Sequence, residues 1–352
     1  MKAPILAFVM PVLAAAALSP AKSAAPHPPP LERPPQFLVM SFDGAGTVDL
    51  WRHWRAIAKK SGAHFTFFLS GVYLLEPEHA AEYHSPDRVA GVSSIGFLPV
   101  PKGARSEPTL RALIAEIDGA RAEGHEIGTH FNGHFCGDHG ATVWDVEDWR
   151  TEIDEFRRLL REVDANNRLD PPSAMVLGSA AIVGARVPCL DSDRHDLEAA
   201  LASTGFRYDA SRPGLAGEWP RVENGLWSFP VPPLSLADAP HPVLATDYNL
   251  WQHHASAGTP ERAAAIERET YDALMAAFDE SYYGKRAPFA VSSHFEHWNR
   301  EAYLNALGHF LRDACARPET RCESFESVVD WLDAQPDLAR LRHGDFPRAH
   351  RG

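Results

Sequence analysis

Residues 37–69 read FLVMSFDGAGTVDLWRHWRAIAKKSGAHFTFFL, and this stretch decides the fold class. Its first six residues form a continuous apolar run of strand length, which ends in the turn-forming residues 43–46, DGAG. Residues 48–60 then carry apolar side chains at helical spacing, and a Ser-Gly pair ends that pattern. A second apolar run at 64–69 completes a strand–helix–strand unit, which is typical of a parallel sheet.

The same alternation of strand and helix patterns continues along the chain. Further strands are expected at 126–129, 174–177, 206–209 and 289–292. Further helices are expected at 110–123, 149–163, 197–201, 266–278, 302–315 and 325–332. The Pro- and Gly-rich stretch 212–242 is expected to be a long surface loop. No composition break or internal repeat divides the chain, so we predict an α/β fold with one main domain.

The composition is that of an ordinary globular protein. The 352 residues are 45% hydrophobic, 10% aromatic and 23% charged, which excludes a disordered or fibrous chain. The formal net charge of −13 argues against a nucleic acid or an anionic membrane as a partner bound through general electrostatics. Beyond the N-terminus, the sequence predicts no membrane helix, because no later segment is long and apolar enough.

The N-terminus has the build of a secretory signal peptide. A short basic start is followed by an apolar run and by small residues at 23–25 that resemble a cleavage site. We therefore expect residues 1–25 to be removed and the mature protein to be periplasmic or extracellular; a retained N-terminal anchor is the alternative. The other predicted parts are a Pro-rich tether at 26–36, the main domain at 37–340 and a tail at 341–352.

Export permits disulfide bonds between the four cysteines. Cys315 and Cys322 are close in sequence, so a local bond is the simplest pairing, and Cys136 and Cys189 would then pair with each other. This is one of three possible connectivities, and four free thiols are the alternative. A four-cysteine zinc site is disfavoured, because no two cysteines are separated by two residues.

Three ionisable residues directly follow predicted strands: Asp43, His130 and His294. Because the carboxyl ends of parallel strands meet at one edge of a sheet, these side chains are expected to lie together. A simpler interpretation exists for each, since Asp43 can cap a turn and histidines are common in this chain. His134 follows His130 by four residues, which we expect to place both imidazoles on one face of a helical turn, where they can bind one metal ion.

Four short motifs carry a family resemblance when they are read in chain order. They are SFDG at 41–44, HFNGH at 130–134, RVPC at 186–189 and SSH at 292–294, with GHEIGTH at 124–130 leading into the second. In this order they resemble the polysaccharide deacetylase family (NodB homology, carbohydrate esterase family 4), whose motifs are T/S-F-D-D-G, H-S/T-x-x-H, R-x-P-Y and L-x-H. The resemblance extends from about residue 37 to about residue 331, and it implies a distorted (β/α) barrel with seven parallel strands.

The resemblance implies a role for each matching residue. His130 and His134, with Asp43 near them, would hold a divalent metal ion, usually zinc, that polarises the acetamide carbonyl and its bound water. Asp43 would be the general base, and His294 would be the general acid that protonates the leaving amine. Arg186, which without the resemblance is either a surface charge or a buried guanidinium, would orient Asp43 and hold it ionised.

The chain departs from the family at two positions. The family's second Asp, normally the third metal ligand, is Gly44 here, although zinc prefers three protein ligands and a water. Asp43 itself ligates the metal, or another acid such as Asp49 or Asp247 fills the gap, or metal binding is weak or absent. The tyrosine of the third motif is Cys189, which removes one wall of the usual groove and suits the disulfide proposed above.

A further element of the resemblance is an acid that tunes the catalytic histidine, with a Trp nearby. Asp209, or Asp247 with Trp251, would fill this role, and these three residues are also candidate substrate contacts. Aromatic residues near the predicted site loops are either platforms for sugar rings or packing hydrophobes: Trp227, Tyr248, Trp251 and Trp298.

These observations predict an exported, metal-dependent hydrolase that removes N-acetyl or O-acetyl groups from a carbohydrate polymer. Two alternatives follow from the incomplete first motif. One is a non-catalytic glycan-binding envelope protein, and the other is a related amidohydrolase that acts on a small C–N substrate.

Overall fold

The structure, a computed structural model, describes residues 31–137 and 140–349. The predicted signal peptide and residues 26–30 of the predicted tether lie outside this part of the chain. Within it, no helix is both long enough and apolar enough to cross a membrane.

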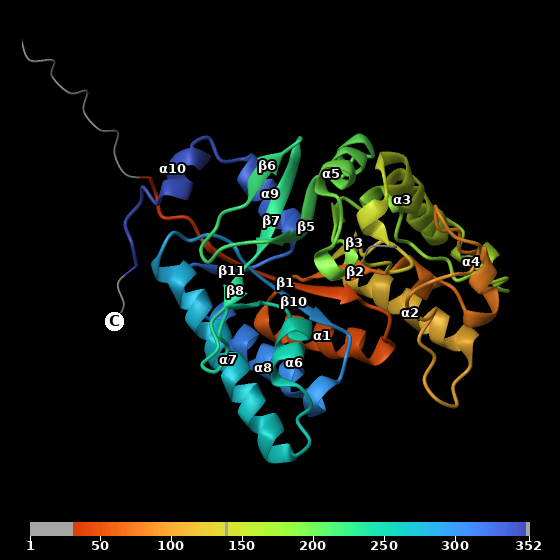
Figure 1. Ribbon diagram of the computed structural model, residues 1–352, viewed down its shortest axis with the longest axis horizontal. Coiled ribbons are helices and arrows are strands. Elements are labelled where there is room, and N and C mark those ends of the chain that lie inside the picture. The colour runs from red at the N-terminus through yellow and green to blue at the C-terminus, as the bar shows by residue number, and fades with distance from the viewer. Residues whose placement is uncertain (1–30, 138–139, 350–352) are drawn as a thin grey trace, which may run out of the picture. The chain divides into compact units, whose positions relative to one another are not determined.

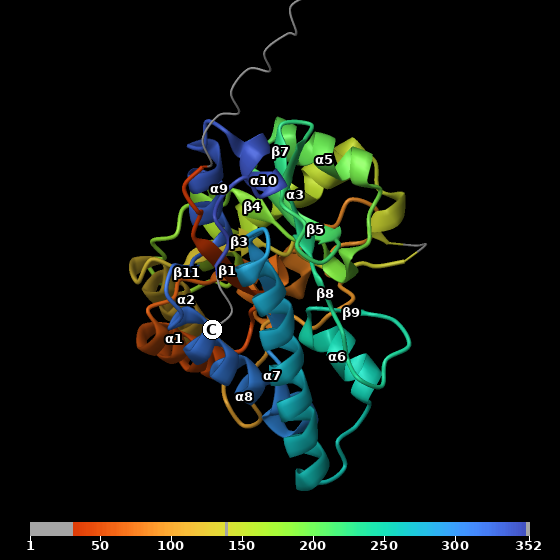
Figure 2. The ribbon, with the colours of Figure 1, turned by 90° about the vertical axis from the view of Figure 1, so that its left-hand side faces the viewer.

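A curled, mostly parallel sheet organises the domain (Figures 1 and 2). Its hydrogen-bonded order is β10-β1-β2-β3-β4-β5-β7-β6, in which β6 alone runs antiparallel to its neighbour, and β11 pairs with the start of β1. The seven parallel strands of this order are β10 (Phe289–His294), β1 (Gln36–Gly44), β2 (Thr66–Leu69), β3 (Glu126–Thr129), β4 (Gly184–Ala185), β5 (Tyr208–Pro213) and β7 (Leu226–Val231). The other strands are β6 (Arg221–Glu223), β11 (Thr320–Cys322) and the antiparallel pair β8 (Pro233–Leu234) and β9 (Val243–Leu244). This arrangement confirms the predicted α/β barrel class.

The α-helices of the described residues lie around the outside of this sheet, with α7 and α8 side by side (Figures 1 and 2). The first five are α1 (Val48–Ser61), α2 (Ser106–Ala122), α3 (Val146–Arg161), α4 (Val163–Asn166) and α5 (Arg194–Ser203). The others are α6 (Asp247–His254), α7 (Pro260–Tyr283), α8 (Trp298–Cys315), α9 (Phe325–Asp333) and α10 (Leu338–His343).

The first strand and helix show why the sequence folds in this way. β1 is buried on both faces up to Asp43, which explains its continuous apolar run in place of an alternating pattern. α1 packs two Trp rings on the sheet: the centre of Trp51 is 4.1 Å from Phe67, and the centre of Trp54 is 4.6 Å from Phe42. These contacts fix the carboxyl end of β1, where Asp43 lies.

Two predictions about the middle of the chain were wrong. The strand expected at 174–177 is irregular, and the parallel strand of this region is the two-residue β4. The loop expected at 212–242 contains β6 and the fully buried β7. Pro230 argued against a strand at β7, because proline normally interrupts the hydrogen bonds of a sheet. Here it lies beside a register shift between β5 and β7.

Both ends of the described chain pack on the domain. The Leu31 N–H donates to the Asp345 carbonyl over 2.8 Å, and Leu341 and Phe346 are buried. β1 begins one residue before the predicted boundary at 36/37, and α10 crosses the predicted boundary at 340/341. The buried core therefore includes residues of the predicted tail.

Candidate active site

Strand pairing brings the candidate residues together. β1 and β10 are parallel neighbours, and Asp43 lies opposite His294 in their register. His130 directly follows β3, and Arg186 directly follows β4. All four residues are therefore at the carboxyl edge of the sheet, where functional side chains of parallel α/β folds gather.

Asp43 is a buried carboxylate with polar contacts on both oxygens. Arg186 Nη1 donates to its Oδ1 and Oδ2 over 3.3 and 3.4 Å, and Ser292 Oγ donates to Oδ2 over 2.8 Å. Burial alone would raise the pKa of Asp43, but the Arg186 charge, with two nearby imidazoles, holds that pKa below its ordinary value. Asp43 is therefore ionised and able to accept a proton.

Arg186 is the buried guanidinium of the two alternatives, not a surface charge. Its side chain is 1% exposed, its Nε donates to the Ala210 carbonyl over 2.8 Å, and its Nη1 donates to Ser41 Oγ over 3.2 Å. Its guanidinium carbon lies 4.9 Å from the centre of the Phe68 ring. These contacts orient the guanidinium toward Asp43.

His294 is held by a second buried carboxylate, Asp247, at the start of α6. Asp247 Oδ1 accepts from His294 Nδ1 over 2.7 Å, and Oδ2 accepts from the His294 backbone N–H and from Ser293 Oγ, each over 2.8 Å. Since a carboxylate only accepts, Nδ1 carries the hydrogen of this bond. Burial, the largest single effect, lowers the pKa of His294, but the Asp247 charge, the Asp247 hydrogen bond and the Asp43 charge together raise it by more, so the net shift is upward. Of the two predicted tuning acids, Asp247 is the one in contact with the histidine.

The two histidines of the HFNGH segment lie close together in a loop. The helical turn predicted from their spacing was wrong. Phe131 and His134 have positive φ values of 56° and 55°, which a helix does not allow. The two imidazole rings still lie 5.3 Å apart, centre to centre. His130 Nδ1 is 2.9 Å from the Arg186 carbonyl, which leaves Nε2 as the free ring nitrogen. Burial lowers the pKa of His130 to about 3, so this imidazole is neutral.

Glu152 supports this loop and was not predicted from the sequence. On the buried face of α3, its Oε1 accepts from the backbone N–H of Asn132 over 3.1 Å and of Gly133 over 3.4 Å. Tyr83 Oη donates to the same oxygen over 3.0 Å. Burial raises the pKa of Glu152 to about 7. The available signal was an acid on the apolar stripe of an amphipathic helix, beside Ile153.

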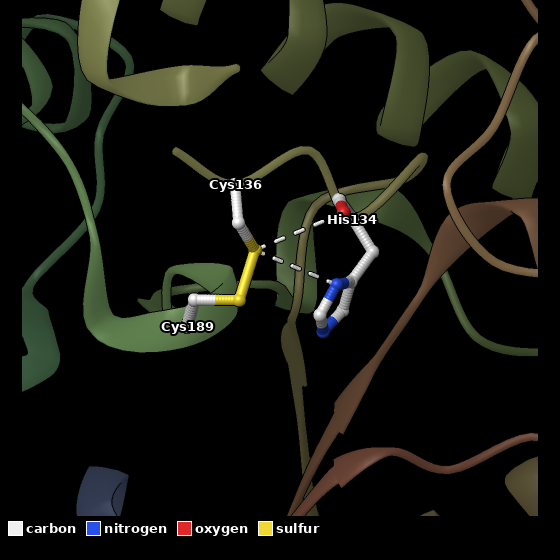
Figure 3. A group of neighbouring side chains, drawn as sticks. All are labelled: His134, Cys136 and Cys189. Carbon is white, nitrogen blue, oxygen red and sulfur yellow. Dashed lines mark hydrogen bonds between the residues drawn. A yellow bond between two sulfur atoms is a disulfide. The ribbon is translucent and has the colours of Figure 1, made fainter. Parts of the chain in front are cut away.

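Two disulfide bonds join the four cysteines, as predicted. Cys315 pairs with Cys322 across a separation of 7 residues, and Cys136 pairs with Cys189 across a separation of 53. Figure 3 shows the second bond beside His134, whose Nδ1 is 3.7 Å from Cys136 Sγ. This bond ties the loop after β3 to the loop after β4, so it links the second motif to the third.

Removing the Cys136–Cys189 bond is expected to lower the free energy of unfolding by about 4 kcal/mol, because the bond closes a long loop in the unfolded chain. Urea unfolding of the Cys136→Ser/Cys189→Ser variant and of wild type measures the difference. The matched control is Cys315→Ser/Cys322→Ser, whose shorter loop predicts a loss of about 2 kcal/mol. Equal losses in the two variants would contradict this ranking.

Neither predicted substitute for the carboxylate missing at Gly44 lies with the two histidines. The Asp49 carboxylate faces His297 Nε2 over 3.5 Å on the exposed side of α1. Both oxygens of Asp247 are bonded at His294. The gap at position 44 is therefore not filled by these acids.

The donors near the two histidines do not fit a preformed zinc site. Within the described ranges, one group of three His, Cys, Asp or Glu side chains has its donor atoms within 4.8 Å of one another: His134, Cys136 and Cys189 (Figure 3). Its sulfur atoms form the disulfide bond, and Asp43 does not make such a group with His130 and His134. Because zinc takes at least three protein ligands at about 2.0–2.3 Å, these donors do not confirm the zinc site predicted from the sequence.

Two of the other predicted residues lie away from the cavity. Asp209 accepts from Arg194 Nη1 over 3.3 Å and from the Ser211 N–H over 3.0 Å. Trp227 Nε1 donates to Asp333 over 2.7 Å. Both side chains are buried, and neither lines the two hollows that contain Asp43.

Three of the predicted aromatic residues form a wall beside His294. The rings of Trp251 and Trp298 stack with their centres 5.2 Å apart. The centres of Trp298 and Tyr248 are 5.5 and 6.1 Å from that of His294. Trp298 lines the smallest hollow and Tyr248 the one of about 420 Å³, whereas Trp251 stacks on Trp298 and lines neither.

The cavity consists of adjoining hollows. Two of them, of about 190 and 420 Å³, are both lined by the same four side chains: Asp43, His130, His134 and His294. A third hollow of about 700 Å³, between α1 and the loop before α2, shares Thr47 and Pro99 with the smallest one. The site therefore lies inside a cleft and not in one closed pocket.

Tyr73 and Glu296 line the smallest hollow and were not predicted from the sequence. Tyr73 is in the 3-10 helix η1 (Gly71–Leu74), and Glu296 follows β10 by two residues. Burial and the Glu296 charge raise the pKa of Tyr73 to about 12, so the phenol stays protonated at neutral pH. Burial also raises the pKa of Glu296. No spacing or motif marks either residue.

No protein-family model matches the chain, and no curated protein matches its sequence. Solved structures match its fold. A Mycobacterium smegmatis protein assigned to the polysaccharide deacetylases is 16% identical, with a TM-score of 0.53, over 92% of this chain and 98% of that one. Puue allantoinase is 13% identical, with a TM-score of 0.50, over 91% of this chain and 99% of that one. The chain therefore has the fold of the polysaccharide deacetylases, the family that its motifs resemble.

Proposed function

We propose that the chain is an exported hydrolase of amide C–N bonds that removes N-acetyl groups from a carbohydrate polymer. The observation that carries this proposal is the pairing of Asp43 with His294 across β1 and β10, each held by its own buried partner. The first is a carboxylate with a lowered pKa, and the second is an imidazole with a raised pKa. Groups whose environments separate their pKa values in this way are suited to act as base and acid.

Hydrolysis of an acetamide uses both groups. Asp43 takes a proton from a water molecule that attacks the carbonyl carbon, and His294 donates a proton to the departing amine nitrogen. Arg186 keeps Asp43 ionised and oriented, and Asp247 stabilises the protonated form of His294. The base, the acid and the two residues that hold them are all side chains of this protein.

The size of the cleft favours an oligomeric substrate. The hollow of about 190 Å³ shares its four site residues with one of about 420 Å³ and shares Thr47 and Pro99 with one of about 700 Å³, so space for further sugar units adjoins the site on two sides. The ring faces of Tyr248 and Trp298 beside His294 suit the apolar face of a sugar ring. The formal charge of −13 disfavours a nucleic acid in the same cleft.

A small C–N substrate is the second candidate, favoured by the modest volume of the hollow that contains both Asp43 and Tyr73. The likeness in fold to Puue allantoinase is compatible with it. An O-acetyl ester would use the same base and the same cleft. A non-catalytic glycan-binding protein is the candidate from a different class, since Gly44 leaves the first motif incomplete.

Export is proposed from two independent features. The first 25 residues have the pattern of a signal peptide. Both disulfide bonds require an oxidising compartment to persist.

Acetate release from a tetramer of N-acetylglucosamine tests the proposal, with protein purified from an exporting host. We expect more than one acetate per protein molecule, and slower or no reaction with allantoin and with an O-acetylated xylan oligomer. Reaction with allantoin alone would move the assignment to a small C–N substrate. Tetramer binding without any hydrolysis would move it to a glycan-binding protein.

Removing metal ions is expected to leave kcat/KM for the tetramer within about twofold, because Asp43, His130 and His134 do not form a preformed zinc site in the part of the chain that the structure describes. The measurement compares protein dialysed against a chelator with undialysed protein and determines zinc content in both. A loss of activity that zinc restores, with one zinc per chain that is absent in His130→Ala, would instead support the zinc site predicted from the sequence.

A further inference from the structure

A tyrosine ring covers the glycine turn at the end of β1. A Cβ at Gly46 would be 2.6 Å from Tyr73 Cδ2, closer than real side chains approach. A Cβ at Gly44 would be 3.5 Å from Tyr73 Cε2 and 3.8 Å from Tyr73 Oη. The ring therefore lies along this turn with its hydroxyl at the Gly44 end. Tyr73 occupies the space beside the position where the metal-ligating carboxylate is missing.

The Tyr73 hydroxyl is free to act in the cavity. Tyr73 lines the hollow of about 190 Å³ that also contains Asp43 and His294. Its Oη makes no hydrogen bond to any residue that the structure describes, and it is not among the fully buried polar atoms. Other tyrosine hydroxyls are bonded, as Tyr83 is to Glu152. An O–H donor without a protein acceptor thus lies beside the proposed acid–base pair.

The proposed reaction leaves one requirement unmet by Asp43 and His294. Attack on an amide carbonyl places a negative charge on oxygen, and enzymes stabilise that charge with a hydrogen-bond donor or a metal ion. Asp43 is itself an anion, and the proton of His294 is needed at the leaving nitrogen. The group that receives the oxyanion must therefore be another one.

We infer that Tyr73 is a catalytic residue whose hydroxyl donates a hydrogen bond to the oxyanion of the tetrahedral intermediate. This inference rests on the proposed amide hydrolysis and assigns the electrophilic role within it. It also fits the glycine at 46, where a Cβ would clash with the Tyr73 ring; Gly44 is explained by its backbone φ of +84°.

The step conserves atoms and charge. The water oxygen bonds to the carbonyl carbon, one water proton moves to Asp43, and the C=O π pair becomes the oxyanion lone pair that Tyr73 Oη–H holds. That pair then re-forms C=O while the C–N bond breaks, and the nitrogen takes a proton from His294. The products are the free amine and acetic acid, and the proton on Asp43 returns to His294 through solvent.

Tyr73→Phe tests the inference, because Phe keeps the ring contacts at Gly44 and Gly46 and removes only the hydroxyl. We expect kcat for the N-acetylglucosamine tetramer to fall by about 10²–10³-fold, the usual cost of losing one oxyanion donor, with KM changed less than about threefold. The matched control is Tyr271→Phe, whose hydroxyl bonds Asp313 over 2.9 Å outside the cleft. That variant is expected to keep the wild-type kcat.

A tetrahedral analogue gives a second readout that a merely structural role would not change. A methylphosphonamidate of glucosamine carries anionic oxygens where the oxyanion forms. Tyr73→Phe should weaken its binding by about 10-fold or more while leaving binding of the intact tetramer unchanged, as measured by calorimetry. Equal losses for both ligands would show a general packing defect and overturn the inference.

The possible failures are distinguishable. If wild type hydrolyses the tetramer and Tyr73→Phe keeps its kcat within about threefold, the inference is overturned and the hydrolase proposal stands. If wild type requires zinc for turnover, the metal and not Tyr73 receives the oxyanion, and the inference is again overturned. If wild type hydrolyses none of the substrates, the hydrolase proposal fails first and the inference falls with it.

Discussion

Replacing Asp43 with Asn is expected to lower kcat for the N-acetylglucosamine tetramer by about 10³–10⁴-fold. The amide cannot accept the proton of the attacking water, although it matches the carboxylate in shape. On this account neither nearby carboxylate replaces Asp43: Asp247 is bonded at His294, and Glu296 lines only one of the two hollows that Asp43 shares with the histidines. Steady-state acetate release at pH 7 measures the effect.

The same substitution also changes stability, and this must be separated from the loss of kcat. It removes the negative charge that Arg186 Nη1 faces, and Arg186 is almost completely buried. Breaking a buried ion pair from one side costs up to about 3–5 kcal/mol. Activity is therefore compared well below the unfolding temperature of the variant. The control is Asp272→Asn at an exposed position on α7, which makes the same Asp-to-Asn change away from the site. A folded Asp43→Asn protein that keeps more than a tenth of wild-type kcat would contradict the assignment of the base.

His294→Gln is the second large effect that we expect, with a loss of about 10²–10⁴-fold in kcat. Glutamine can still donate to Asp247, so the local structure is retained, but it cannot deliver a proton to the leaving amine. A substrate analogue with a better leaving group, such as the acetanilide of a weakly basic aniline, should recover part of the lost rate. Equal loss with both substrates would contradict a role as general acid.

The pH dependence of the rate tests the assignment of Asp43 as the base and of His294 as the acid. The base must be deprotonated and the acid protonated, so the rate falls as pH drops through the lowered pKa of Asp43 and falls as pH rises through the raised pKa of His294. The plateau therefore extends from below the ordinary value of 3.8 to above the ordinary value of 6.5. Asp247→Asn removes the charge that raises the pKa of His294, so the alkaline limb should move to lower pH. A shift to higher pH would contradict this account.

The sequence was most informative where local pattern and strand register coincide. The apolar run at 37–42 and the helical spacing at 48–60 predicted β1 and α1 closely, because a strand buried on both faces is continuously apolar and an amphipathic helix repeats its apolar residues at helical spacing. Asp43, His130 and His294 could be placed at one edge of the sheet before the structure was known, since each directly follows a predicted strand. The disulfide pairing was predicted from sequence spacing, because closing the short loop between Cys315 and Cys322 has the lowest entropic cost.

The sequence was uninformative where long-range packing overrides local pattern. β7 was not predicted because it contains a proline. The loop at 130–134 brings its two histidine rings together through positive φ values at Phe131 and His134, which no spacing rule predicts. Glu152 holds that loop from a helix about twenty residues later along the chain. Tyr73 reaches the glycine turn from another strand end altogether. These contacts are set by tertiary structure, so the residues carry no recognisable local signal.

The most direct test of the central claim is the number of acetate molecules that one protein molecule releases from the N-acetylglucosamine tetramer, for wild type beside Asp43→Asn and His294→Gln. We predict many turnovers by wild type in the presence of a chelator and fewer than about one per hundred wild-type turnovers by either variant. Release by wild type that does not exceed either variant would contradict the claim that Asp43 and His294 form a hydrolytic base–acid pair.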